Sequence, residues 1–180
     1  MERDNGSVIV FEDEASLSNT ATISYLWAEK GKQPKLKQKQ RQRERKTLFG
    51  CVEPQTGIVV TSENERGNTK SFFSFLIKTV KRFENRKVVM VLDNVKYHHA
   101  KRLKPILAKY SHRIELVFLP AYSPDLNPME RIWWYMRKKI THNRFLEKME
   151  NRIEVFRNLM SQFQIENDLG KSLCNLFENI

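Results

Sequence analysis

Cysteine is scarce in this chain of 180 residues, and long hydrophobic runs are missing. The two cysteines, Cys51 and Cys174, are too few for a four-ligand zinc site and predict no disulfide framework. No apolar run approaches the ~18 residues of a membrane-spanning helix, and the first residues, MERDNGS, do not read as a signal peptide. We therefore expect a protein of a reducing, cytoplasmic compartment with no membrane partner, associated with the nucleoid if the source is prokaryotic.

Acidic side chains are also in deficit. Lys and Arg number 32 against 21 Asp and Glu, which gives a formal net charge of +11. Such an excess favours binding to a polyanion, most simply nucleic acid, although a basic protein can also merely be soluble. With 40% hydrophobic residues, no internal repeat and no Gly/Ser linker, the chain has the composition of a globular protein with a substantial core.

Two continuous apolar runs end in acidic residues. Residues 7–11 lead into the acids at 12–14, and residues 87–92 lead into Asp93. Runs of this length are typical of strands that are buried on both faces. Acids after a strand are commonly solvated, but parallel neighbouring strands would bring Asp13 and Asp93 to one edge of a sheet, where sites in α/β proteins collect.

The remaining pattern predicts a mixed sheet with helices packed on it. The other expected strands lie at 47–52, 57–61 and 114–118, with a further extended piece at 23–28. The expected helices lie at 68–83, 98–110, 128–140 and 145–163, followed by a short helix or a frayed tail.

The stretch 119–134, LPAYSPDLNPMERIWW, runs from a turn-rich segment directly into a helix. Asn127 suits the N-cap, and Pro128 suits the first helical position. Glu130 then falls in the first turn, either as a capping-box glutamate that reaches back to Asn127 or as a rigidly held metal ligand. Local chemistry favours the cap, but the two aspartates lead us to expect that Glu130 is both.

Three carboxylates at one edge would repel one another unless cations lay among them. Oxygen ligands without a Cys or His cluster favour Mg²⁺ or Mn²⁺. Two such ions that bridge a phosphodiester are the usual means of in-line phosphoryl transfer. The residues thus predict two ions at Asp13, Asp93 and Glu130.

The segment 30–46, KGKQPKLKQKQRQRERK, carries nine Lys or Arg residues against one Glu. Between residues 35 and 45 the cations alternate, which on an extended backbone places them on one side, as a phosphate track requires. A solvated loop or an exposed hairpin face is the alternative. The candidate nucleic-acid-binding residues are Lys30, Lys32, Lys35, Lys37, Lys39, Arg41, Arg43 and Arg45.

Three motifs carry a resemblance over residues 8–140: F-x-D-E, V-L-D-N-x-x-x-H and L-P-x-Y-S-P-D-L-N-P-x-E-x-x-W. In these motifs the chain resembles the catalytic domain of the mariner-like insertion-sequence transposases, DDE-type enzymes on an RNase H-like fold. The resemblance implies an α/β fold with a mixed five-stranded sheet flanked by helices. We expect a catalytic domain at 1–145 and a C-terminal helical extension at 146–180 packed on it.

The resemblance also implies roles for single residues. Asp13, Asp93 and Glu130 correspond to the catalytic, metal-binding acids, and 36 residues separate the second from the third. Glu12 and Glu14 flank Asp13 and remain open as alternatives for the first ligand. The supporting residues, which orient Asp93 or cap a helix, are Asn94, His98 and Asn127.

The activity that the resemblance implies is metal-dependent DNA cleavage at the ends of a mobile element, then transfer of the freed 3′-hydroxyl to target DNA. Pairing two element ends implies a homodimer. Such transposases normally begin with helix-turn-helix domains, whereas the first expected strand here begins near residue 7. We therefore expect a catalytic half with a possible separate N-terminal helix-turn-helix chain.

Two other functions fit parts of the pattern. A structure-selective nuclease would keep the RNase H-like fold and the acids. A non-catalytic nucleic-acid-binding module would use the segment 30–46 and would need no acidic triad.

Overall fold

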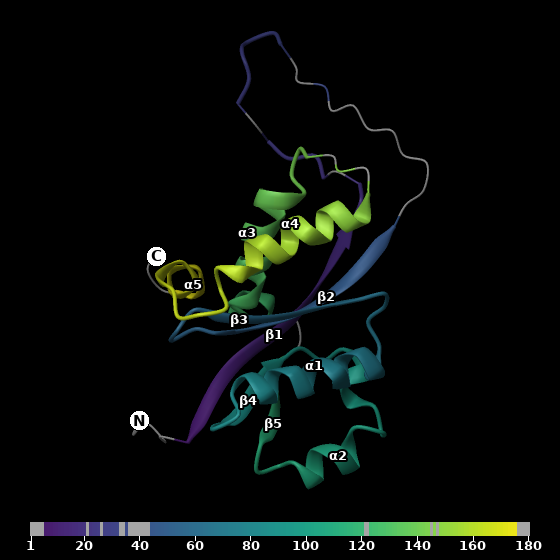
Figure 1. Ribbon diagram of the computed structural model, residues 1–180, viewed down its shortest axis with the longest axis vertical. Coiled ribbons are helices and arrows are strands. Elements are labelled where there is room, and N and C mark those ends of the chain that lie inside the picture. The colour runs from purple at the N-terminus through teal and green to yellow at the C-terminus, as the bar shows by residue number, and fades with distance from the viewer. Residues whose placement is uncertain are drawn as a thin grey trace.

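The computed structural model describes residues 6–20, 22–25, 27–32, 35, 44–120, 123–144, 146 and 148–175. At its centre lies a five-stranded sheet in the order β3-β2-β1-β4-β5 (Figure 1). The strands are β1 (Ser7–Ser18), β2 (Arg45–Glu53), β3 (Ile58–Asn64), β4 (Lys87–Leu92) and β5 (Ile114–Phe118). β1, β2 and β3 pair antiparallel, whereas β4 and β5 run parallel to β1. The predicted mixed five-stranded α/β sheet is confirmed.

Helices cover both faces of the sheet. The helical elements are α1 (Thr69–Arg82), η1 (Lys96–His99), α2 (Lys104–Lys109), η2 (Pro124–Leu126), α3 (Met129–Ile140), α4 (Met149–Ser161) and α5 (Asp168–Cys174). α3, α4 and α5 lie on the face opposite α1 (Figure 1). In the part of the chain that the structure describes, no helix is long and apolar enough to cross a membrane.

Alternation along the strands divides the core into two clusters. In β2, Leu48 and Val52 pack in the cluster with α3, α4 and α5, while Phe49 and Cys51 pack in the cluster with α1. Successive strand side chains point to opposite faces, so each central strand contributes to both clusters. The predicted apolar stripe of α3 is buried in the first cluster, and its members are Met129, Ile132, Trp133, Met136 and Ile140.

β1 is longer than predicted. We expected a strand at 7–11 that gives way to a loop at the acids, but β1 continues to Ser18. Its parallel partner β4 pairs only as far as Phe11, whereas β2 pairs with β1 from Phe11 to Ser18. The acids at 12–14 therefore lie within a strand, because β2 continues to supply its hydrogen bonds after β4 has ended.

Three other predictions of extent are wrong. The helix expected at 98–110 is split into η1 and α2, since Pro105 suits only the first turn of a helix and stops α2 from extending further back. The helix expected from 145 begins at Met149, because Lys148 has an extended backbone. Within the described residues of 23–28 there is no strand, and only an isolated bridge between Thr22 and His142 lies beside them.

Candidate metal-binding active site

The register of β1 against β4 brings two aspartates together. Phe11 of β1 pairs with Val91 of β4 in the parallel ladder. Asp13 lies two residues after Phe11, and Asp93 lies two residues after Val91. One oxygen each of Asp13, Glu14 and Asp93 lie within 4.8 Å of one another. The structure thus places the first two acids of the expected triad where β4 ends, and it adds Glu14 to them.

A glycine on the neighbouring strand allows α3 to approach this point. Gly50 of β2 pairs with Asp13, and a Cβ atom built on Gly50 would lie 2.6 Å from Cζ2 of Trp133. It would also collide with Cε of Met129. Only a residue without a side chain at position 50 lets the start of α3 pack directly on β2. Glu130 lies in the first turn of this helix.

Glu130 acts on Asp13 through its charge. The pKa of Asp13 is raised to about 8, mainly by burial and next by the carboxylate of Glu130. Glu130 is 44% exposed and lies 3.6 Å from Nη2 of Arg137. Among the described residues, Glu130 does not join the acids whose oxygens lie within 4.8 Å of one another. The third acid therefore faces the pair from α3 and is held by a cation of its own helix.

Asn127 ties the start of α3 to β1. Its Oδ1 accepts a hydrogen bond from the amide of Met129 at 3.0 Å, and its Nδ2 donates to the carbonyl of Glu12 at 2.7 Å. The predicted capping box is wrong: within the described residues no hydrogen bond joins the Glu130 carboxylate to the amide of Asn127. Asn127 alone caps the first amide, which leaves Glu130 available for another role.

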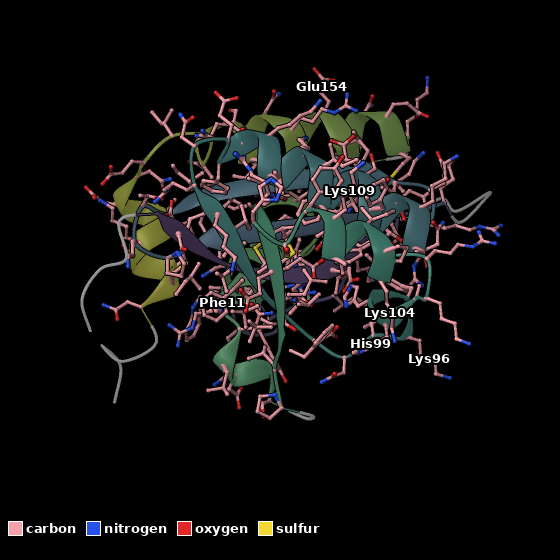
Figure 2. All side chains as sticks on the ribbon, turned by 90° about the horizontal axis from the view of Figure 1, so that it is seen from below. Phe11, Lys96, His99, Lys104, Lys109 and Glu154 are labelled. Carbon is pink, nitrogen blue, oxygen red and sulfur yellow. The ribbon has the colours of Figure 1, made fainter. Side chains whose placement is uncertain are left out.

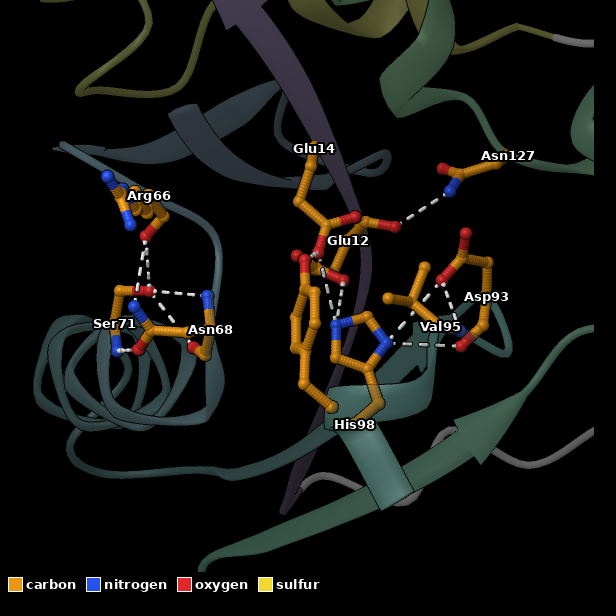
Figure 3. A network of polar contacts seen from close by, with 10 residues as sticks. Glu12, Glu14, Arg66, Asn68, Ser71, Asp93, Val95, His98 and Asn127 are labelled. Atoms are coloured by element: carbon orange, nitrogen blue, oxygen red, sulfur yellow. Dashed lines mark hydrogen bonds and ion pairs between the residues drawn. The ribbon is translucent and has the colours of Figure 1, made fainter. Parts of the chain in front are cut away.

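A polar cluster around the buried His98 lies beside Asp93 (Figure 3). Nδ1 of His98 lies 3.2 Å from the carbonyl oxygen of Asp93 and 3.4 Å from its Oδ1. Nε2 of His98 lies 3.2 Å from Oε1 of Glu14 and 3.9 Å from Oε2 of Glu12. The hydroxyl of Tyr97 donates to Glu14 as well. One imidazole thus connects Asp93 to both glutamates of β1.

Glu12 is enclosed rather than poised at the surface. It is completely buried, and neither carboxylate oxygen has a hydrogen-bond partner in the described chain. Burial raises its pKa well above the usual value, and the charges of Glu14 and Asp13 raise it further. Burial of this kind disfavours the ionised form of a carboxyl group. Burial and the bond to Glu14 likewise raise the pKa of Tyr97.

Asn94 links the ends of two strands instead of orienting Asp93. Its Nδ2 donates to the carbonyl of Leu119 at 2.7 Å, and its Oδ1 lies 3.3 Å from Nε2 of His99. Asp93 is oriented by its own turn, because its Oδ1 accepts the amide of Val95 at 3.1 Å. Neither Asn94 nor another side chain caps η1 in the described structure.

Only half of the predicted basic track can be placed. Lys30, Lys32, Lys35 and Arg45 are exposed, and Lys32 pairs with Glu29 at 2.6 Å. The other four predicted residues lie outside the described residues, namely Lys37, Lys39, Arg41 and Arg43.

A second basic surface follows Asp93 and was not predicted. Its exposed cations on and between η1 and α2 are Lys96, Lys101, Arg102, Lys104 and Lys109. Figure 2 labels Lys96, Lys104 and Lys109 among them. The sequence contains no acid between residues 94 and 114, which is the signal that would have revealed it. Cations beside an acidic site are suited to hold the phosphates of a polyanion near it.

Known proteins resemble this chain in sequence and in fold. The family described as DDE superfamily endonuclease matches residues 8–152. The insertion element IS630 uncharacterized 39 kDa protein of Shigella sonnei is 24% identical over 153 residues, which cover 84% of this chain and 44% of that protein.

Two solved complexes of the Mos1 transposase share the fold. The paired-end complex with the left transposon end gives a TM-score of 0.69 at 18% identity and covers 96% of this chain and 52% of that one. The mariner paired-end complex with Mg gives a TM-score of 0.68 at 18% identity. The match covers 95% of this chain and 53% of that one. The predicted RNase H-like fold is thereby confirmed, and this chain spans about half the length of these relatives.

Proposed function

Since the chain belongs to the DDE superfamily of endonucleases, we propose that it cleaves DNA strands and transfers them during DNA transposition, with divalent metal ions. The predicted likeness to mariner-like insertion-sequence transposases is confirmed by the family match and by the insertion-element relative. The observation that carries the proposal is the meeting of Asp13 and Asp93 where β4 ends, with the first turn of α3 packed against them. In this proposal the catalytic acids are Asp13, Asp93 and Glu130.

The donor set fits a hard divalent cation. Asp13, Glu14 and Asp93 offer only carboxylate oxygens, and Mg²⁺ and Mn²⁺ prefer such ligands. Burial and, next, the facing carboxylate of Glu130 raise the pKa of Asp13, and a bound cation would favour its ionised form. Asp13 and Asp93 would hold the ions together with Glu130, and we propose two ions. Bound there, they would activate the attacking water or 3′-hydroxyl and stabilise the leaving oxygen.

The chain's own residues position this site. The imidazole of His98 contacts the carbonyl and carboxylate oxygens of Asp93 and so fixes this residue. Asn127 fixes the start of α3 to the backbone of Glu12. This contact holds the first turn, which carries Glu130, at a fixed position relative to β1. The cations of η1 and α2 would hold the DNA backbone while the acids act on it.

The partners follow from the proposed reaction. We propose that the DNA is the element end and the target, that two copies of the chain act together, and that a separate helix-turn-helix chain supplies recognition of the ends. Relatives of about twice this length have been solved with transposon-end DNA or as paired-end complexes. In competition binding, the chain alone should not distinguish terminal-repeat DNA from random DNA.

Nicking of supercoiled plasmid and cleavage of element-end DNA test the function. The wild-type chain is assayed with Mn²⁺, with Mg²⁺ and with EDTA, beside Asp93→Ala. We expect cleavage that requires the metal and is lost in Asp93→Ala. Cleavage that survives this substitution would refute the assigned acids. DNA binding without cleavage and without any response to Mn²⁺ would favour a non-catalytic module.

A further inference from the structure

An apolar groove lies between α1 and α2. It has a volume of about 310 Å³, and its lining comes from α1, α2 and the turn that leads into β5. Leu76 and Ile114 contribute to the lining and are buried members of the core cluster with α1. Ile77 of α1 and Tyr110, which follows α2, also line it, and they are 41% and 45% exposed. The groove, which we call the α1–α2 groove, thus connects the edge of the core with solvent.

The short length of α2 explains why the groove is open. α2 has six residues, and none of them is buried. α1 has 14 residues, so it is much the longer of the two helices, and α2 lies below it at the lower end of the molecule (Figure 1). Ile106 and Leu107 of α2 are only partly buried although they face the groove. The apolar face of α1 is therefore left partly uncovered beside α2.

The charge around the groove is of one sign. Neither α1 nor the segment 95–113 contains Asp or Glu. Lys81 and Arg113 line the groove, and the part of the lining that the structure describes includes no acid. The acids just beyond these two segments are Glu84 and Glu115, and Glu115 is paired with a lysine of β4. The α1–α2 groove therefore combines an apolar lining with cations that have no acidic neighbour on either helix.

This combination distinguishes between possible occupants. Duplex DNA would satisfy the cations, but its phosphates would leave the apolar side chains without a partner. A second copy bound symmetrically would place the same cations opposite each other, which charge repulsion disfavours. An amphipathic helix lays its apolar side chains into such a groove, and acidic residues beside them would face Lys81 and Arg113.

We infer that the α1–α2 groove binds an acidic amphipathic helix of a protein partner. Apolar side chains of the partner would contact Ile77 and Tyr110, and its carboxylates would lie near the two cations. Asp13, Asp93 and Glu130 do not line the groove. The inference therefore adds a protein partner to the proposed DNA reaction and does not rest on that reaction.

The test uses three labelled peptides of about 16 residues, a length at which a helix can form. The first has Leu at helical i, i+3, i+4 and i+7 spacing and Glu and Ala elsewhere. The second replaces each Glu by Lys, and the third keeps the composition of the first but scrambles the Leu positions. Fluorescence anisotropy measures the binding of each peptide to the wild-type chain and to four variants.

Each variant has a matched control on the opposite face of the sheet. Ile77→Ser removes a partly exposed apolar side chain from the groove. Its control is Val155→Ser on α4, at a β-branched residue that is 38% exposed. Lys81→Glu reverses one charge at the groove, and Lys139→Glu on α3 makes the same change at another exposed lysine. Each pair therefore changes polarity or charge equally and differs in location.

We expect the acidic amphipathic peptide to bind the wild type with a Kd of roughly micromolar order, and the other two peptides at least about tenfold more weakly. Ile77→Ser and Lys81→Glu should each lose roughly fivefold or more in affinity for the first peptide. The two controls should stay within about twofold of the wild type. The loss in Lys81→Glu should shrink as salt is raised, because salt screens exposed charges.

Other results would overturn the inference. They include no binding of the acidic peptide, equal binding of all three peptides, and an equal loss in Val155→Ser. A dimer that Ile77→Ser splits would assign the groove to a second copy of the chain. A loss of duplex-DNA affinity in Ile77→Ser as large as its loss of peptide affinity would assign the groove to DNA. If Ile77→Ser did not fold, Lys81→Glu and its control would decide.

Failure of the inference can be told apart from failure of the proposed function. Metal-dependent DNA cleavage by Ile77→Ser should equal that of the wild type, because Ile77 lies in α1 and outside the acidic site. Peptide binding is measured in EDTA without DNA. Peptide binding can therefore be absent while cleavage persists, and cleavage can be absent while the peptide still binds.

Discussion

At Asp13, charge and burial oppose each other. Its pKa is about 8 in the folded chain, because it is buried and faces Glu130, against about 3.9 for an unfolded aspartate. The folded state thus binds a proton that the unfolded state releases above pH 4. Without metal, this group makes the protein less stable as pH rises from about 4 to about 8. A divalent cation at the site reverses the effect, since it stabilises the ionised form.

Replacing Asp13 by Asn should therefore stabilise the metal-free protein at pH 8. The loss of stability between pH 5 and pH 8 should become smaller, by at most roughly 1.4 kcal/mol for each pH unit. Urea unfolding in EDTA across this range measures it, with Asp168→Asn as the control at a fully exposed aspartate. Added Mn²⁺ should stabilise the wild type but not Asp13→Asn. Equal pH dependence in both proteins would contradict the raised pKa.

His98 should affect metal binding without being a ligand. It contacts Asp93 on one side and Glu14 on the other, and loss of such a supporting contact typically costs 10–100-fold in metal affinity. We expect this loss of Mn²⁺ affinity in His98→Ala. Partial recovery is expected in His98→Asn, whose amide can replace Nδ1. Isothermal titration with Mn²⁺ tests it, and His99→Ala, at an exposed imidazole, should bind Mn²⁺ normally.

At the scale of elements, the site depends on how closely α3 packs on β2. Gly50 leaves no side chain between them, and Asn127 fastens the start of the helix to β1. These contacts come from segments more than 70 residues apart in the sequence. The position of Glu130 is therefore a product of tertiary packing rather than of its local motif.

Gly50→Ala should destabilise the chain by about 1–3 kcal/mol, because the new methyl group collides with the Trp133 ring and overpacks the core. It should also weaken Mn²⁺ binding, since the start of α3 must move away from Asp13. Urea unfolding and Mn²⁺ titration measure the two effects. Gly67→Ala is the matched control, because its nearest contact would be an acceptable 3.4 Å. If both substitutions had the same small effect, close packing at Gly50 would not position the helix.

The pattern of apolar residues predicts the apolar strands and the buried stripe of α3 well, because the burial of these faces alone requires that spacing. It does not predict that β1 continues through Glu12, Asp13 and Glu14, since three acids in succession normally end a strand. The pairing with β2 that keeps them extended joins residues some 35 positions apart. The sequence does not predict the buried contacts of His98 for the same reason. They join segments whose packing no local pattern encodes.

At the scale of the whole molecule, two groups of exposed cations accompany the acidic site in the described residues. The first group is Lys30, Lys32 and Lys35 in the connection between β1 and β2, and the second lies along η1 and α2, while Asp13, Glu14 and Asp93 meet where β4 ends. The excess charge of +11 thus favours binding of DNA, which the acidic site alone would repel.

Removing cations from the connection should lower the salt dependence of DNA binding. Lys30→Gln/Lys35→Gln should reduce the slope of log K against log salt by roughly 1.8 for duplex DNA if each lysine neutralises one phosphate. The matched control is Lys70→Gln/Lys81→Gln, which removes two exposed lysines of α1 on the other face of the sheet. Anisotropy titrations between low and moderate salt measure the slopes. Identical slopes in the two variants would make this segment a solvated loop.

The central claim is that the ends of β1 and β4 and the start of α3 together form a divalent-metal site. Anomalous scattering from crystals soaked in Mn²⁺ tests it most directly. The account predicts a peak between the carboxylates of Asp13 and Asp93, facing Glu130, that disappears in Asp93→Ala. A peak instead among Glu12, Glu14 and His98, or no peak at saturating Mn²⁺, would contradict it.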